Sequence, residues 1–201
     1  MNEDKIEFFL QSLELKDEKR TGWQLRNIED PETVADHTWG VTLLTLIHAP
    51  ENLDRDKALK IATVHDLGET EIGDIAKRKL NQQQEISDEE KQQLEEQTVK
   101  KLSQKAGSDE ILQLWKEYEK RETPEARFVK DMDLVDMCLT ALKYEKKQRY
   151  DPEEENKNFQ EYKHLDEFFA TTQERLQTKK GQKLFREIKK KYQKTKNQNK
   201  K

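Results

Sequence analysis

The 201-residue sequence contains few residues that constrain or break a chain: one cysteine, six glycines and four prolines. Cys138 can form no disulfide within the chain, which agrees with a reducing compartment such as the cytoplasm. Its neighbours, Met137 and Leu139, are typical of a small core side chain rather than of a nucleophile. The acidic start, MNEDKIEFFL, is not a secretory signal, and the longest apolar-leaning stretch, Val41 to Ala49, is too short to span a bilayer. We expect a cytoplasmic protein without a membrane-spanning segment.

Apolar residues are also scarce, at 32% of the chain against 40% charged residues. This balance favours thin helical elements with solvated outer faces over a large sheet core. The sequence shows no alternating strand pattern of useful length and no internal repeat. Its length fits one domain. The sequence therefore predicts an all-α protein.

Charge is abundant but unevenly placed along the chain. Residues 179–201 contain eleven Lys or Arg and one acid, a net of +10, so the whole-chain charge of −4 leaves −14 on residues 1–178. A body this acidic repels the phosphates of nucleic acids, so we expect no nucleic-acid ligand. We interpret the basic segment as a solvated helix that frays at its end, KTKNQNKK.

Apolar periodicity and capping signals predict where the helices lie. Pro31 opens one helix, Asp54 caps the next, and Ser87 with Glu90 forms a capping box. Thr123 caps a helix with proline in its first turn, and Gly68 and Gly107 mark helix ends. KRTGWQLRNIEDPET is predicted to be a loop that continues into the helix at Pro31. The predicted helices cover roughly residues 6–13, 31–48, 55–67, 88–106, 109–119, 124–147, 161–177 and 181–194.

One segment, ATVHDLGETEIGDI at residues 62–75, places a histidine and four carboxylates among apolar residues and glycines. Charged groups near a core are costly unless they are paired or bound to a metal. His37 and His65 both follow helical apolar faces and so point inward, although either alone is most simply an ordinary core histidine. The adjacent Asp66 changes this interpretation, because a carboxylate beside an inward histidine at a helix end needs a partner. A divalent cation is the natural one, since imidazole and carboxylate suit borderline metals.

A further ligand must come from another helix, and FVKDMDLVDM offers two candidates. Asp131 has Phe128, Leu134 and Val135 among its helical neighbours, while Asp133 has Val129 and Met137. Periodicity does not choose between the two.

Three blocks of the sequence resemble the HD-domain metal-dependent phosphohydrolases: RTGWQLRNIEDPETVADHTWGV, ATVHDLGETEIGDI and EARFVKDMDLVDMCLTALKYE. Their details are similar to the 5′-deoxynucleotidase branch, the HD-domain-containing protein 2 type. The resemblance implies an HD-domain helical bundle of about six to eight helices with a peripheral C-terminal helix. The domain would cover residues 1–178, and residues 179–201 would form the basic helix and frayed tail.

The resemblance also assigns the site residues. It implies a metal site made of His37, His65, Asp66 and Asp133, with Asp133 selected by the alignment of FVK. It implies that Glu69 and Asp74 act at the reaction centre, where they hold a second cation with the backbone of Ile75. Glu71 is interpreted as a solvated loop residue. The cation is one of Mn, Co, Mg, Zn, Ni or Fe.

The reaction that the resemblance implies is hydrolysis of deoxyribonucleoside 5′-monophosphates to deoxynucleoside and phosphate. Arg20 and Trp23 resemble the substrate segment of this family, where Arg can clamp phosphate and an aromatic side chain can pack on the sugar. Arg26 is a rival to Arg20. Lys77 is a further candidate for phosphate contact, although a solvated basic turn also explains it.

Other functions remain open. HD enzymes that cleave cyclic dinucleotides, alarmones or nucleoside triphosphates would use the same metal ligands, and a non-enzymatic helical interaction module or a nuclease is a more distant alternative. A homodimer is expected from the resemblance. Aromatic clusters at Trp115, Tyr118, Phe168 and Phe169 could form its interface or simply pack in the core.

Overall fold

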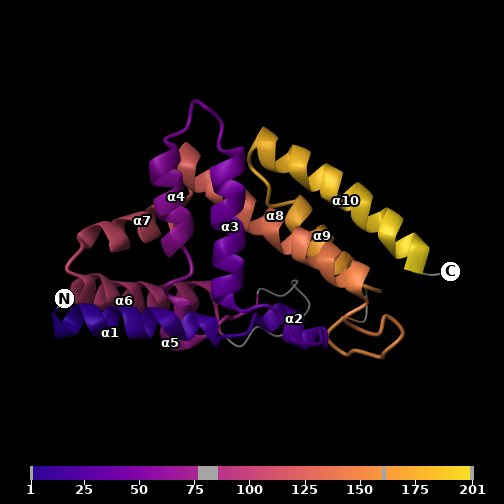
Figure 1. Ribbon diagram of the computed structural model, residues 1–201, viewed down its shortest axis with the longest axis horizontal. Helices are drawn as coiled ribbons and strands as arrows, with labels where there is room; N and C mark the ends of the chain where they lie inside the picture. The colour runs from indigo at the N-terminus through magenta and orange to yellow at the C-terminus, as the bar shows by residue number, and fades with distance from the viewer. Residues whose placement is uncertain (1, 77–85, 160–161, 200–201) are drawn as a thin grey trace.

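The computed structural model describes residues 2–76, 86–159 and 162–199, and Figure 1 shows their arrangement. These residues form helices and no strand, and their isolated backbone bridge joins Lys19 to Thr33. The all-α prediction is confirmed. The elements are α1 (Glu3–Leu13), a 3-10 turn η1 (Glu14–Lys16), α2 (Thr21–Leu25), α3 (Val34–His48), α4 (Arg55–Val64), α5 (Glu69–Ile72), α6 (Asp88–Ala106), α7 (Asp109–Lys120), α8 (Pro124–Lys147), α9 (Asp166–Gln173) and α10 (Lys179–Asn199).

Most helix starts follow their capping residues. Asp54, Ser87 and Thr123 each accept a hydrogen bond from a backbone N–H in the first turn of their helix, as predicted. The prediction at Pro31 was wrong. α3 begins at Val34 because Thr33 caps it and forms a capping box with Asp36.

The segment between α4 and α6 differs most from the prediction. α4 ends at Val64, and the short helix α5 follows after a few turn residues. Gly68 is not a left-handed helix stop, because its φ is −61°. A Cβ atom there would lie 2.7 Å from the Cβ of Glu95, so glycine allows α6 to approach closely. The short helix α2 lies where the sequence predicted a loop.

α8 is the central helix, and α3, α4, α7, α9 and α10 all contact it. Figure 1 shows α10 lying along α8, while α1 and α6 run side by side on the other side of the molecule. Cys138 on α8 is fully buried, as predicted for a core side chain. The aromatic residues suggested for an interface are also core residues, at most 9% exposed: Trp115, Tyr118, Phe168 and Phe169.

The C-terminal helix is longer than predicted. α10 places Phe185, Ile188 and Tyr192 in the same apolar core as α8. It continues to Asn199, whose side-chain amide donates to the backbone and carboxylate oxygens of Glu145. The predicted fraying after residue 194 is therefore wrong for the described residues. None of the described helices combines the length and apolar character needed to cross a membrane.

Candidate metal centre and its pocket

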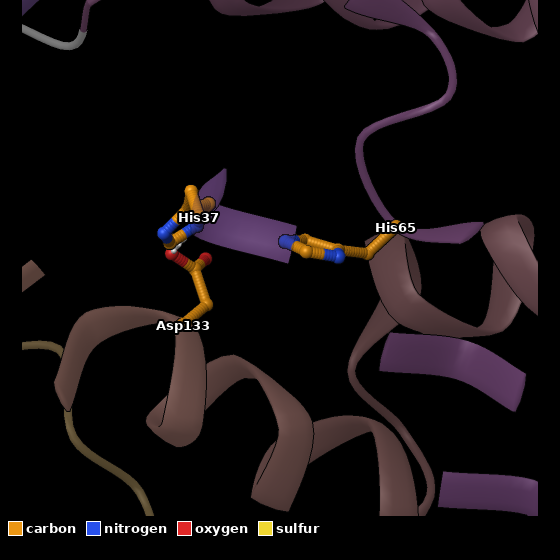
Figure 2. A group of neighbouring side chains, drawn as sticks. All are labelled: His37, His65 and Asp133. Atoms are coloured by element: carbon orange, nitrogen blue, oxygen red, sulfur yellow. Dashed lines mark ion pairs between the residues drawn. The ribbon is translucent and has the colours of Figure 1, made fainter. Parts of the chain in front are cut away.

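Three helices bring the predicted metal ligands together. His37 comes from α3, His65 and Asp66 from the turn directly after α4, and Asp133 from the middle of α8. Figure 2 shows His37, His65 and Asp133 pointing toward one another, with one ligand atom from each lying within 4.8 Å of the others. The Oδ2 atom of Asp66 lies 3.1 Å from His65 Nε2 and 3.8 Å from His37 Nε2. Residues far apart in the sequence thus form one cluster.

The chemistry of this cluster fits a divalent cation. Three of its buried atoms have no hydrogen-bond partner in the described chain: His37 Nε2, His65 Nε2 and Asp66 Oδ2. Buried polar atoms that lack partners carry a desolvation cost, and a bound ion removes this cost for all of them at once. Two imidazoles and two carboxylates also leave coordination positions open for water and substrate.

Each histidine has its other ring nitrogen fixed by the protein. His65 Nδ1 lies 2.8 Å from the carbonyl oxygen of Ala62, and His37 Nδ1 lies 2.8 Å from Asp136 Oδ2. Both partner oxygens can accept a hydrogen bond from Nδ1, and in both rings Nε2 is the nitrogen that lies at the cluster. Burial and Arg20 oppose protonation of His37, but Asp133 and Asp136 raise its pKa to about 10 in the metal-free protein.

The structure separates the two aspartates between which periodicity could not choose. Asp133 Oδ1 lies 3.3 Å from His37 Nε2, while its Oδ2 accepts hydrogen bonds from Tyr118 and Lys130, each at 2.6 Å. Against the effect of burial, Lys130 and His37 hold the pKa of Asp133 well below its usual value. Asp131 instead accepts hydrogen bonds from the backbone N–H groups of residues 177 and 178 and from the Thr178 hydroxyl, just before α10 begins.

Glu69 lies on α5 at the edge of the cluster and is 6% exposed. Burial, together with the nearby charges of Asp66 and Asp74, raises the pKa of Glu69 well above its usual value. The Lys91 ammonium on α6 lies 3.4 Å from Glu69 Oε1 and 3.2 Å from the carbonyl oxygen of Ile75. A lysine therefore occupies part of the place where the sequence predicted a second cation.

Asp74 and Arg20 lie close to each other beside the cluster. Asp74 accepts a hydrogen bond from the backbone N–H of Thr21 at 2.7 Å, so the start of α2 fixes its position. The Arg20 guanidinium lies 3.8 Å from Asp74 Oδ1 and 3.9 Å from Asp66 Oδ2. These long ion pairs leave the guanidinium available to an incoming anion.

A pocket opens over these residues, and Arg20, Asp66, Glu69, Asp74 and Asp133 line it. Trp23 also lines the pocket but is only 1% exposed, because its ring packs on Phe168 and its indole N–H donates to Glu32. The pocket therefore reaches little of the Trp23 ring.

Two further predicted contacts lie elsewhere. Arg26 does not line the pocket, because it is buried over the Tyr150 ring and donates to the carbonyl oxygen of His164. Lys77 lies outside the described residues.

Glu71 is exposed to solvent, as the sequence suggested, but it is not in a loop. It lies on α5, and its carboxylate accepts hydrogen bonds from Gln11, Thr98 and Lys101. Glu71 thereby ties α5 to α1 and α6, away from the metal cluster.

Sequence reasoning missed several residues around the cluster. Lys130 and Asp136 are three residues before and after Asp133, so a search of the same helical face could have found them. Tyr118 and Lys91 come from helices distant in sequence, and no local pattern indicates that they lie beside Asp133 and Glu69.

The chain is similar to several known proteins. Residues 13–177 match the family described as HD domain. The 5′-deoxynucleotidase HDDC2 of Bos taurus is 38% identical over 135 residues, which cover 66% of this chain and 63% of that protein. The 5′-deoxynucleotidase hdd1 of Schizosaccharomyces pombe is 37% identical over 140 residues, which cover 66% of this chain and 68% of that protein. The crystal structure of the PH0347 protein from Pyrococcus horikoshii OT3 superposes with a TM-score of 0.70 at 31% identity, covering 96% of this chain and 98% of that chain.

The chain belongs to the HD-domain family. Within that family it belongs to the branch whose curated members are named 5′-deoxynucleotidases. The similarity spans just under two thirds of the length of the Bos taurus relative.

Proposed function

We propose that this protein is a metal-dependent 5′-deoxynucleotidase, which hydrolyses deoxyribonucleoside 5′-monophosphates to deoxynucleoside and phosphate. The observation that carries the proposal is the convergence of three buried atoms without a hydrogen-bond partner, His37 Nε2, His65 Nε2 and Asp66 Oδ2. They lie beside Asp133, at the base of a pocket that Arg20 also lines. The names of the relatives supply the substrate class.

His37, His65, Asp66 and Asp133 would hold the divalent cation. When bound, the ion supplies a Lewis acid for the phosphoryl oxygens and lowers the pKa of a bound water. The protein fixes some of these ligands before the ion binds, because Ala62 holds the ring of His65, and Tyr118 and Lys130 hold the carboxylate of Asp133.

Phosphate recognition is assigned to Arg20. Its guanidinium lies between Asp66 and Asp74, and burial alone would lower its pKa, but these acids raise it. Arg20 therefore stays protonated and offers two-pronged hydrogen bonding to a phosphate dianion. This cation offsets the acidic surroundings that would otherwise repel the substrate.

Hydrolysis requires one proton to move. Water forms the new bond to phosphorus, the bond from phosphorus to the 5′ oxygen breaks, and a proton passes to that oxygen as the deoxynucleoside leaves. Glu69 is suited to carry this proton, because its raised pKa lets the carboxyl group hold a proton nearer neutral pH. Asp74, fixed by Thr21, is suited to position the water or the sugar.

The test combines metal analysis with phosphate release. The purified protein should retain a divalent metal and release phosphate from dAMP and dTMP faster than from AMP and UMP, and a chelator should abolish the release. Metal analysis identifies the ion among Mn, Co, Mg, Zn, Ni and Fe. Full activity in the presence of chelator would refute the proposal.

A His65→Ala variant tests whether activity depends on the metal ligands. It should lose bound metal and phosphatase activity while its circular dichroism remains helical. A panel with cyclic dinucleotides, alarmones and nucleoside triphosphates distinguishes other HD substrates, because the same ligands would serve them.

We further propose a cytoplasmic homodimer. The exposed face of α3 is apolar, with Trp39 and Ile47 at 69% and 64% exposure and Leu43 and Leu46 beside them. A helix that is apolar on both its buried and outer faces is normally covered on both. Light scattering should give twice the chain mass, and Trp39→Glu should give a monomer. A wild-type protein that is monomeric at high concentration would exclude the dimer.

A further inference from the structure

Asp136 is a buried carboxylate that contacts the His37 ring on the side away from the metal cluster. Asp136 Oδ2 is 2.8 Å from His37 Nδ1, and the His37 side chain is fully buried. Asp136 does not line the pocket that contains Asp66 and Asp133. It lines a second hollow between α3 and α8, so the imidazole ring separates Asp136 from the metal cluster.

Gly40, one turn after His37 on α3, makes this approach possible. A Cβ atom at Gly40 would lie 2.2 Å from Asp136 Oδ1 and 2.9 Å from its Cγ. Gly40 is inside a regular helix, where alanine is the more favourable residue and no unusual backbone angle requires glycine. Glycine at position 40 therefore leaves the space in which the Asp136 carboxylate packs against α3.

Glu32 is the other acid near this side of His37, but it has other partners. Its Oε1 accepts from the Trp23 indole and its Oε2 accepts from the Thr140 hydroxyl, both at 3.0 Å. Among the described residues, Asp136 is thus the acid that binds His37 Nδ1.

We propose that Asp136 is a positioning residue that holds the His37 ring with its proton on Nδ1 and its Nε2 turned to the metal cluster, in a space kept open by Gly40. A carboxylate that accepts from Nδ1 fixes the ring orientation and makes Nε2 a stronger metal ligand. The inference rests on the metal-binding part of the proposed function and adds two residues to it.

The same helix offers a matched control. Asp131 on α8 is also a buried carboxylate against a glycine, because a Cβ atom at Gly181 would lie 2.3 Å from Asp131 Oδ2. Asp131 binds the segment before α10 and has no contact with His37. The Asp131 and Gly181 pair therefore reproduces the packing of Asp136 and Gly40 without the histidine.

The experiment measures Co²⁺ affinity by calorimetry in wild type and four variants: Asp136→Asn, Gly40→Ala, Asp131→Asn and Gly181→Ala. The asparagine at 136 can present either an oxygen or an NH₂ group to Nδ1, so it no longer enforces one tautomer. We expect Kd to rise about 10- to 100-fold in the first two variants and to change less than about twofold in the other two.

A spectroscopic readout separates positioning from general destabilisation. In Zn²⁺-loaded wild type, the ¹H–¹⁵N spectrum of the histidine rings should show a His37 Nδ1–H protected from exchange. Asp136→Asn should lose this signal, and Asp131→Asn should keep it. Thermal melts report on folding, and if Gly40→Ala does not fold, Asp136→Asn decides alone.

Two results would overturn the inference while leaving the metal site intact. One is wild-type Co²⁺ affinity in Asp136→Asn, and the other is equal weakening in all four variants. A wild-type protein that binds no Co²⁺ would overturn the metal site of the proposed function and this inference with it.

Discussion

α5 and α8 each carry two acids that are two residues apart, and in both helices the two acids have different roles. On α5, Glu69 lies in the pocket while Glu71 binds Gln11, Thr98 and Lys101. On α8, Asp133 lies in the pocket while Asp131 binds the segment just before α10. Residues two apart on a helix are about 200° apart around its axis, so one of each pair faces the site and the other a neighbouring helix.

In each helix one of the two acids has a raised pKa and the other a lowered pKa. The acid in the pocket has the raised pKa on α5 and the lowered pKa on α8. Burial raises the pKa of Glu69, while the hydrogen bond from Lys101 lowers that of Glu71. On α8 it is the pocket residue, Asp133, whose pKa is lowered, and burial raises that of Asp131. The balance between burial and nearby charges, rather than membership of the pocket, decides the direction of each pKa shift: Lys130 and His37 outweigh burial at Asp133, whereas Asp66 and Asp74 add to burial at Glu69.

The largest difference is expected on α8. Asp133→Ala should lower kcat/KM for dAMP by about 10³-fold or more, because it removes a metal ligand and leaves the buried Lys130 without its acid. Asp131→Ala should keep kcat/KM within about twofold of wild type per folded molecule. Steady-state kinetics and metal analysis measure both. Equal losses in the two variants would contradict the division of roles.

The pair on α5 should show the next largest difference. Glu69→Gln should lower kcat by about 10²- to 10⁴-fold with a smaller change in KM, because the amide cannot carry a proton. Glu71→Gln should keep kcat, since its carboxylate lies away from the pocket. Single-turnover phosphate release separates the chemical step from binding. Unchanged turnover in Glu69→Gln would remove this residue from the mechanism.

Asp131 should matter for the stability of the fold rather than for catalysis. Asp131→Ala should lower the free energy of unfolding by about 1–3 kcal/mol, because two backbone N–H groups and the Thr178 hydroxyl lose their acceptor. Thr178→Val removes one of these bonds and also the bond that the Thr178 hydroxyl accepts from the Gly181 N–H, and it should cost about 1–2 kcal/mol. Urea unfolding of the metal-free proteins measures both values. Wild-type stability in Asp131→Ala would indicate that Asp131 does not anchor the segment before α10.

The smallest effects are those on the pH dependence of stability, and they should have opposite signs on α5. The folded pKa of Glu71 lies below its usual 4.5, so its stabilisation is present above that pH and disappears as the pH falls through the folded value. Glu71→Gln should therefore cost less than about 1 kcal/mol at neutral pH and nothing in acid.

Glu69 has a raised pKa, so its ionised form destabilises the metal-free fold. Glu69→Gln should be more stable than wild type at neutral pH, and the difference should vanish below the unfolded pKa of 4.5. Urea titrations across this range test both signs. Destabilisation by Glu69→Gln at neutral pH would show that the Lys91 contact outweighs burial.

Local sequence patterns predicted the helices well where capping residues are strong. Ser87, Asp54 and Thr123 begin their helices as predicted, because a cap needs only a hydrogen bond to a residue three positions on. Pro31 misled the prediction, since Thr33 offers a complete capping box two residues later. α2 and α5 were missed, because helices of four or five residues have too few turns to show a periodic pattern.

The sequence by itself determined the helical class, most helix limits and the candidates His37, His65 and Asp66, because each depends on residues a few positions apart. The tertiary structure decided which of Asp131 and Asp133 faces the pocket, that Lys91 meets Glu69, and that Asp136 holds His37. The residues in those contacts are 15 to 99 positions apart in the sequence, and whether they meet depends on how α3, α6 and α8 are oriented against their neighbours. Periodicity defines the face of a helix, but only packing decides which neighbour that face meets.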